Sequence, residues 1–217
     1  MRVLAFIYEG MTLLDMVGPI QAWSFMPGME VQFVGKKVGP VKTDCGLSIM
    51  ATHDLSSAWS DPDVLFIGGA GKPTLGMIGD KAVTAFLRDR GSRAKWVTSV
   101  CTGSLILGAA GLLEGYRAAT YWSAGDHLAQ FGATRSDDRV CIDRNRMTGG
   151  GITSGIDFGI AVAAHWAGDQ TGKLIELMME YAPQPPFGTG RPELADAGTL
   201  ALARQLVEAE FSESPKP

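Results

Sequence analysis

The chain has 217 residues, of which 46% are hydrophobic and 19% are charged, and its formal net charge is -4. This composition is typical of a compact water-soluble protein, and the length suits one α/β domain over residues 1–217, with a frayed tail near 212–217. The negative net charge and the absence of any run of Lys or Arg argue against a nucleic-acid-binding protein. No segment reaches the roughly 18 apolar residues that a membrane span requires, so we expect no membrane partner.

The three cysteines, Cys45, Cys101 and Cys141, are odd in number and widely spaced, with no CxxC pair. This pattern predicts neither a disulfide framework nor a zinc site, and it fits a reducing compartment. The apolar run at the N-terminus, residues 3–8, ends at Glu9 and Gly10 and is too short for a signal peptide. We therefore expect a cytoplasmic protein.

Short apolar runs alternate with longer helical patterns along the chain. In chain order we predict a strand at 3–8, a helix opened by Gly18-Pro19, a strand at 31–34, a hairpin over 39–51, a strand at 64–67, a helix at 80–90, a strand at 95–99 and a helix at 104–110. There follow a strand at 118–121, a helix at 124–131, a hairpin over 140–148, helices at 154–167 and 170–181, an irregular Pro-rich stretch at 182–192 and a helix at 195–210. This alternation predicts a mostly parallel sheet with helices on both faces.

The segment from Val97 to Ser104 carries the strongest chemical signal. A β-rich run stops at Cys101, and a helix of small residues follows at once. The unpaired N–H groups at the start of that helix favour a thiolate, so we expect the pKa of the Cys101 thiol to fall. The alternative is a buried cysteine that packs as a small hydrophobic residue, and the elbow alone leaves both interpretations open.

Two further candidates follow strands of the same predicted sheet. Asp15 lies in apolar surroundings shortly after the first strand, and the loop 68–71 (Gly-Gly-Ala-Gly) follows the third. Ligands of open α/β sheets bind at the carboxyl ends of the strands, so we expect both to lie near Cys101. Asp15 would titrate together with the thiol, or else would cap the helix near Gly18.

Glycine-rich loops supply the candidate substrate contacts. The N–H groups of Gly69 and Ala70 are candidates to hold a developing negative charge, and Gly151 and Ile152 belong to a second such loop. The alternative for each loop is a tight turn that requires glycine. His53, His127 and His165 do not cluster, so no metal site is predicted.

These residues resemble the ThiJ/PfpI superfamily of class-I glutamine-amidotransferase-like proteins. The resemblance covers almost the whole chain and is carried by several motifs: Asp15–Pro19, Gly39–Val41, Thr98–Ser104, Leu107–Leu113, Thr148–Asp157 and Glu180–Phe187. Asp15, the Cys101-Thr102-Gly103 elbow and the Pro-rich tail are similar to the isonitrile hydratase branch.

The resemblance implies a flavodoxin-like fold, a homodimer, no cofactor, and a small-molecule substrate: an isonitrile that is hydrated to an N-substituted formamide. By position it implies that Cys101 is the nucleophile, Asp15 the acid/base and Thr102 a residue that positions the sulfur. Gly68 and Tyr121 stand where relatives often carry Pro and His. The protease and glyoxalase branches often carry His directly after the nucleophile and Glu at position 15, and Thr102 and Asp15 in this chain argue against both. A glyoxalase- or deglycase-type enzyme is the alternative activity within the superfamily.

Two rivals to this function belong to other classes. A redox or ligand sensor would use the same cysteine without turnover. A DNA-binding regulator of the same superfamily would need a helix-turn-helix module after Phe187, where only about thirty residues remain, so this class is disfavoured.

Overall fold

The computed structural model describes residues 1–212, so the predicted tail lies outside the described residues from 213 onward. The strands are β1 (Arg2–Phe6), β2 (Glu30–Val34), β3 (Gly39–Lys42), β4 (Ser48–Ala51), β5 (Val64–Ile67), β6 (Trp96–Val100), β7 (Arg117–Ala118), β8 (Thr134–Arg135), β9 (Val140–Asp143) and β10 (Arg146–Gly149). The helices are α1 (Leu13–Trp23), α2 (Pro73–Gly79), α3 (Lys81–Arg93), α4 (Gly103–Ala109), the 3₁₀ helix η1 (Trp122–Phe131), α5 (Ser154–Ala167), α6 (Asp169–Met178) and α7 (Ala197–Ser212).

The main sheet has six strands in the order β2-β1-β5-β6-β10-β9. All neighbouring strands are parallel except the edge strand β9, which is antiparallel to β10. The hairpin β3–β4 and the short pair β7–β8 form separate small sheets. The predicted α/β fold with a mostly parallel sheet is confirmed.

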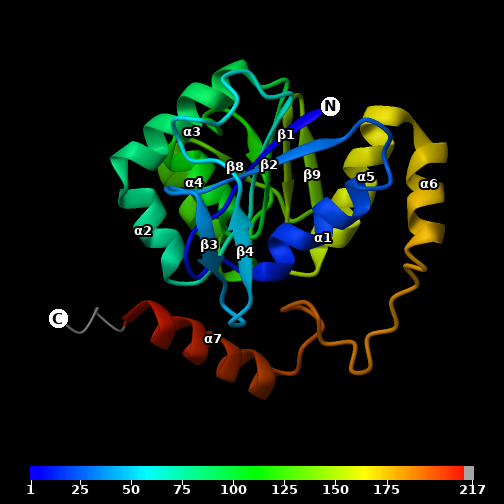
Figure 1. Ribbon diagram of the computed structural model, residues 1–217. Helices are drawn as coiled ribbons and strands as arrows, with labels where there is room; N and C mark the ends of the chain where they lie inside the picture. Colours follow the sequence, from blue (N-terminus) through cyan, green and yellow to red (C-terminus); the bar gives the residue numbers. More distant parts are fainter. Residues whose placement is uncertain (213–217) are drawn as a thin grey trace.

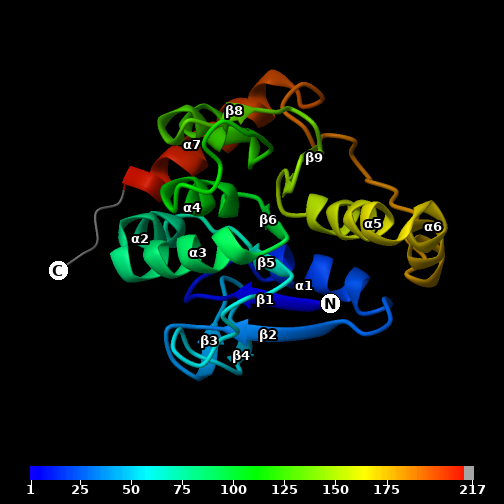
Figure 2. The ribbon, with the colours of Figure 1, turned by 90° about the horizontal axis from the view of Figure 1, so that it is seen from above.

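Helices cover both faces of this sheet (Figure 2). The helices α2, α3 and α4 pack together on one face, and α1, α5 and α6 pack together on the other. The two layers bury the central strands, which is why β5 (Val-Leu-Phe-Ile) is apolar at every position and has no exposed residue. The core is continuous from β1 through α5.

Small residues bring α1 and α5 into close contact beside the site. A side chain at Gly159 would lie 2.8 Å from the Ala22 Cβ and 2.9 Å from the Pro19 Cα. The indole N–H of Trp23 donates to the Gly159 carbonyl at 3.0 Å, so the large ring is buried without an unsatisfied donor. This contact fixes the position of α1 and therefore of Asp15.

Several elements of the structure differ from those predicted, and the strand predicted at 118–121 is only the two-residue β7. Helix α1 begins at Leu13 rather than near Gly18, because the Asp44 carboxylate accepts the Leu13 N–H and stabilises an earlier start. Pro19 therefore lies inside the helix, where it lacks the N–H that would bond to the Asp15 carbonyl. Helix α2 was not predicted, although Pro73 occupies a favourable first position. Residues 122–131 form a 3₁₀ helix.

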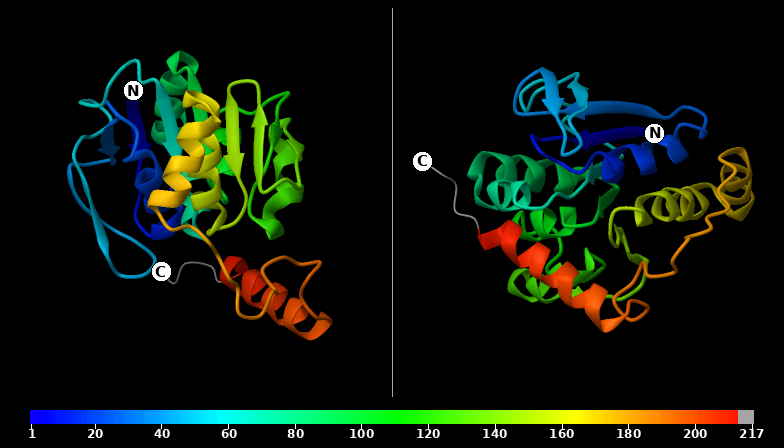
Figure 3. Two further views of the ribbon diagram at one scale, coloured as in Figure 1. Left: turned by 90° about the vertical axis from the view of Figure 1, so that its right-hand side faces the viewer. Right: turned by 90° about the horizontal axis from the view of Figure 1, so that it is seen from below.

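The last described segment is an arm, residues 182–212, that leaves α6 and returns across the molecule. Its first part is irregular, as the Pro-rich sequence predicted, and α7 follows. Figures 1 and 3 show α7 lying across the end of the molecule at which the parallel strands of the sheet finish. No helix within residues 1–212 is long and apolar enough to cross a membrane.

Candidate active site

Cys101 occupies a strained turn between β6 and α4. Its φ is 57°, a left-handed conformation that costs a non-glycine residue of the order of 1–2 kcal/mol. The Cys101 N–H donates to the carbonyls of Gly149 and Gly150, at 3.1 and 2.8 Å, and these bonds hold the turn. Such strain persists only where the surrounding structure enforces it, and it clusters at functional sites.

Asp15 is fully buried in the first turn of α1 and does not cap that helix. One carboxyl oxygen, Oδ2, accepts the Gly69 N–H at 2.8 Å. The other, Oδ1, is buried and accepts no hydrogen bond from the described residues. Burial raises the pKa of Asp15 to about 7, against the opposing effects of the Gly69 N–H and of the Cys101 thiol. Asp15 is therefore poised to exchange a proton near neutral pH.

The structure corrects the prediction that the helix N-terminus lowers the pKa of the Cys101 thiol. Only 5% of the residue is exposed, and burial raises the pKa of the thiol well above its ordinary value. The Asp15 charge raises it further, whereas the Thr102 N–H and side chain lower it. Desolvation and a neighbouring carboxylate thus outweigh the helix N-terminus, and the resting cysteine holds its proton.

Thr102 anchors the glycine loop through its side chain rather than lying free in the site. Its hydroxyl donates to the Ala70 carbonyl at 2.6 Å and accepts the Ala70 N–H at 3.0 Å. The Thr74 hydroxyl completes this buried network, 2.8 Å from that of Thr102 and 2.9 Å from the Ala70 carbonyl. These bonds fix the loop 68–71 against the start of α4.

The N–H groups of Gly69 and Ala70 already have acceptors inside the protein. Gly69 donates to Asp15, and Ala70 donates to the hydroxyls of Thr74 and Thr102. This geometry is at odds with the expectation that the two amides receive charge from a substrate. Their role in the structure is to orient Asp15 and the loop.

The elbow at Cys101 and the loop 68–71 lie so close together that several positions between them have no room for a side chain. A Cβ on Gly69 would lie 2.5 Å from the Thr102 nitrogen, and one on Gly103 would lie 2.6 Å from the Ile67 carbonyl oxygen. A Cβ on Gly68, where relatives often carry Pro, would lie 2.9 Å from the Asp15 Cβ. At Gly69 and Gly103 glycine is favoured because backbone atoms approach more closely than a side chain allows.

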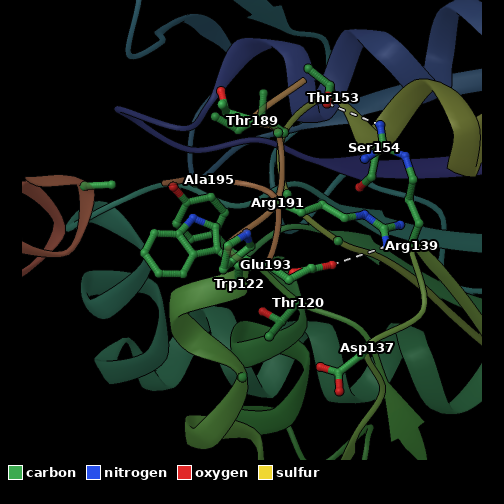
Figure 4. A pocket seen from close by; sticks show the side chains of 18 of the residues that line it. Thr120, Trp122, Asp137, Arg139, Thr153, Ser154, Thr189, Arg191, Glu193 and Ala195 are labelled. Atoms are coloured by element: carbon green, nitrogen blue, oxygen red, sulfur yellow. Dashed lines mark hydrogen bonds and ion pairs between the residues drawn. The ribbon is translucent and has the colours of Figure 1, made fainter. Parts of the chain in front are cut away.

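Gly151 and Ile152 lie beside the elbow in the loop before α5, and both line a cavity of about 610 Å³ (Figure 4). The ring of Tyr121 covers Gly151, where an added Cβ would lie 3.1 Å from the ring. Burial raises the pKa of the half-buried Tyr121, and the nearby Cys101 and Glu210 charges raise it further. Tyr121 therefore lines the cavity as a neutral phenol.

Sequence reasoning missed Thr74, Glu210 and the contribution of Tyr121 to the site. Tyr121 was noted only as a replacement for histidine, although it ends a short predicted strand and this position was a usable signal. Glu210 accepts the Lys72 N–H at 3.2 Å across 138 residues of sequence, and no local pattern reveals such a contact. Thr74 likewise shows no sequence signal.

The histidines lie apart from the cysteine. His53 bonds to Gln32 and Thr52, and His165 packs edge-on against Trp96. Within residues 1–212 no group of three or more His, Cys, Asp or Glu side chains is arranged to hold a metal ion.

Comparison with known proteins agrees with this fold. Residues 1–165 match the model of the DJ-1/PfpI family, and the chain belongs to that family. It is 42% identical over 196 residues to an isonitrile hydratase of Pseudomonas putida, an alignment that covers 88% of this chain and 83% of the relative. A second relative, an uncharacterised protein of Streptomyces lividans, is 35% identical over 59% of this chain and 93% of its own length.

Solved structures extend the comparison to the arm. A ThiJ/PfpI family protein from Pseudomonas syringae is 40% identical with a TM-score of 0.91, covering 97% of this chain and 89% of its own. The oxidised DJ-1 of Toxoplasma gondii is 23% identical with a TM-score of 0.73, covering 84% of this chain and 99% of its own. The latter likeness shows the fold alone.

Proposed function

We propose that this protein hydrates isonitriles to N-substituted formamides, as the name of its Pseudomonas putida relative describes. The observation that carries the proposal is the pairing of Cys101 with Asp15, a buried carboxyl whose pKa of about 7 suits proton exchange. An isonitrile carbon accepts a nucleophile and a proton at the same atom. One thiol and one adjacent acid/base are therefore sufficient for the addition.

The first step adds the thiol to the isonitrile carbon. Asp15, as a carboxylate, takes the proton from Cys101 while the sulfur forms a bond to that carbon. Asp15 then returns the proton to the same carbon, and the product is a thioimidate on Cys101. The charge that develops in this step lies on the carbon beside Asp15, so free amides at Gly69 and Ala70 are not needed.

The second step hydrolyses the thioimidate with a water molecule from solvent. Asp15 accepts a proton from the water as the water oxygen attacks the carbon, and it passes this proton to the nitrogen. The resulting tetrahedral adduct carries OH, sulfur and NH on one carbon. Cleavage of the carbon–sulfur bond, with the hydroxyl proton returning to sulfur, releases the formamide and restores the thiol.

Cysteine variants test the mechanism. Cys101→Ala removes the attacking sulfur and should abolish formamide production, which is followed by chromatography with a simple alkyl isonitrile. Cys45→Ser and Cys141→Ser are the controls and should remain active, because Cys45 is exposed in a hairpin turn and Cys141 lies in β9. Substantial turnover by the Cys101 variant would refute the proposal. We expect the chelator EDTA to leave the rate unchanged.

Two observations disfavour the rival functions. A glyoxalase moves a proton between adjacent carbons, a task better served by an additional base, and no histidine within the described chain contacts Cys101. A redox sensor needs an exposed cysteine with a lowered pKa, whereas Cys101 is buried and its pKa is raised. Formamide from an isonitrile should form much faster than lactate from methylglyoxal, and the reverse order would favour a glyoxalase.

A further inference from the structure

A buried tyrosine outside the proposed mechanism contacts the loop that donates a hydrogen bond to Asp15. Tyr8 follows β1, only 3% of the residue is exposed, and its ring stacks on Phe6 with 6.3 Å between the ring centroids. Its hydroxyl donates to the Gly68 carbonyl at 3.1 Å. A buried hydroxyl without a partner would cost free energy, so this bond fixes both the tyrosine ring and the carbonyl.

The Gly68 carbonyl and the Gly69 N–H belong to one planar peptide unit. Tyr8 holds the oxygen of this unit, and its nitrogen donates to the Asp15 Oδ2 at 2.8 Å. A hydrogen bond accepted by the oxygen polarises the peptide, and the N–H then becomes a stronger donor. Tyr8 and Asp15 are thus joined by a short hydrogen-bonded chain that runs through a single peptide bond.

The surroundings restrict this peptide unit on several sides. Gly68 lies so close to Asp15 that a Cβ added to the glycine would be 2.9 Å from the Asp15 Cβ. At the next residue, the Gly69 carbonyl accepts the Thr12 N–H at 2.9 Å. Tyr8 supplies the hydrogen bond to the peptide oxygen, so the direction of the Gly69 N–H is set by the tyrosine as well as by the backbone.

The Tyr8 phenol keeps its proton at every pH at which the protein works. Burial raises its pKa far above the ordinary value, and the charges of Asp15 and Cys101 raise it further, against the opposing hydrogen bond of the Thr74 hydroxyl. The same Thr74 hydroxyl lies 2.8 Å from that of Thr102, in the network that anchors the loop. Tyr8 is therefore a permanent donor and does not itself exchange the proton of the reaction.

We propose that Tyr8 is a positioning residue: through the peptide between Gly68 and Gly69 it aims the Gly69 N–H at Asp15 and favours the carboxylate, the form of Asp15 that accepts a proton. This effect opposes the effect of burial on the same carboxyl group. The role in catalysis rests on the proposed function, whereas the effect on the ionisation of Asp15 does not. Removal of the Tyr8 hydroxyl should make Asp15 harder to ionise while every reacting group remains in place.

Tyr8→Phe removes the hydroxyl and keeps the ring, so it tests this role with little change in packing. The inflection of kcat/KM for an alkyl isonitrile should move upward by about 0.5 pKa unit or more, which lowers kcat/KM about threefold near pH 6 and leaves it nearly unchanged near pH 9. Tyr116→Phe is the matched control, because its hydroxyl bonds to Asn145 at 3.4 Å, outside the site. An equal loss at every pH, without a shift of the inflection, would overturn the proposal.

Direct titration of Asp15 provides a readout that needs no isonitrile. In protein labelled with ¹³C at the aspartate carboxyl groups, the Asp15 signal is identified by its absence from the Asp15→Asn variant. The midpoint of this signal should rise by about 0.5 pKa unit or more in Tyr8→Phe and stay unchanged in Tyr116→Phe. Incorporation of meta-fluorotyrosine, whose phenol is a stronger donor, should lower the midpoint in the protein that carries Tyr8 and leave it unchanged in Tyr8→Phe.

The titration separates this proposal from the proposed function. If the midpoint rises in Tyr8→Phe while the wild type hydrates no isonitrile, the effect of Tyr8 on Asp15 stands and the proposed function fails. If isonitriles are hydrated but the midpoint is the same in Tyr8→Phe and wild type, Tyr8 only packs in the core and the proposal is overturned. Should Tyr8→Phe fail to fold, the fluorotyrosine shift decides, and its absence overturns the proposal.

Discussion

At the scale of single residues, Asp15 and Cys101 share the chemistry of the site. The pKa of Asp15 is raised to about 7, and the pKa of the Cys101 thiol is raised well above its ordinary value. The two groups together therefore hold one proton above neutral pH and two protons below it. Only the singly protonated pair has a carboxylate that can accept the proton of the thiol. The proposed addition therefore requires Asp15 to be ionised.

This requirement predicts how activity depends on pH. For formamide production, kcat/KM should rise with pH through an inflection near 7. Asp15→Asn keeps the size of the side chain but removes its exchange of protons, so we expect a loss of roughly a hundredfold or more. The measurement is kcat/KM from pH 5 to 9 for both proteins. An Asp15→Asn enzyme with the wild-type rate or the same inflection would show that Asp15 only holds the loop.

The same raised pKa predicts an effect on stability. Between about pH 4 and 7 the unfolded chain ionises Asp15 while the folded protein keeps it protonated, so folding becomes less favourable as pH rises through this window. At about 1.4 kcal/mol for each pKa unit, the full effect is about 4 kcal/mol. The free energy of unfolding of Asp15→Asn relative to wild type should therefore increase from pH 4 to 7 in urea titrations.

Asp54 provides the control for that experiment, because its shift has the opposite sign. The hydroxyls and N–H groups of Ser56 and Ser57 lower the pKa of Asp54 to about 2. Its contribution is present above pH 4 and is lost as the pH falls toward 2, so Asp54→Asn should not reproduce the change between pH 4 and 7. A flat difference for Asp15→Asn across this window would contradict the assigned pKa.

At the scale of elements, the site depends on how closely α4 approaches the end of β5. A Cβ on Gly103 would lie 2.6 Å from the Ile67 carbonyl oxygen and 2.9 Å from that of Gly68. Both neighbours are backbone atoms, which cannot move aside as the end of a side chain can. The first turn of α4 and the position of Cys101 are thus fixed by the absence of one side chain.

Two glycine variants on neighbouring helices test this contact. Gly103→Ala should destabilise the protein by a few kcal/mol and reduce turnover, because α4 must move away from β5. Gly76→Ala in α2 is the control: nothing lies within 4 Å of its added Cβ, and helix propensity predicts a gain of up to about 1 kcal/mol. Thermal unfolding and kcat measure the two effects. Equal stability of both variants would exclude a tight approach at Gly103.

At the scale of the whole molecule, the arm completes a cavity that the body of the protein leaves open on one side. The arm lies beyond the residues 1–165 that match the family, yet it lines the cavity and contacts the loop 68–71 through Glu210. Cys101 and Asp15 lie in segments that follow the strands β6 and β1 of the main sheet.

The association state is a separate prediction at this scale. The family resemblance implies a homodimer, and we expect sedimentation velocity of the purified protein to give about twice the chain mass of 23.0 kDa. The Cys101→Ala variant is a suitable control, since its change is confined to the buried elbow and should leave the mass unaltered. A single species of monomer mass across the micromolar range would contradict the prediction.

The sequence by itself predicted the fold class, which the structure confirms, and singled out Cys101 as the candidate nucleophile. Continuous apolar runs such as β5 occur where both faces of a strand are covered, and Cys101 was identifiable because a strand and a small-residue helix meet there without a linker. Asp15 was recognised by its apolar neighbours. Each of these signals lies within a short stretch of the sequence, so it can be recognised without the structure.

Only the tertiary structure decided the charge state of the site and the outline of the cavity. The helix N-terminus predicted a lowered pKa for Cys101, but burial and Asp15 raise it, and burial is a property of the whole packed molecule. The amides of Gly69 and Ala70 proved to be bonded inside the protein. Glu210 reaches Lys72 across the entire fold, and such a distant contact leaves no periodic trace in the sequence.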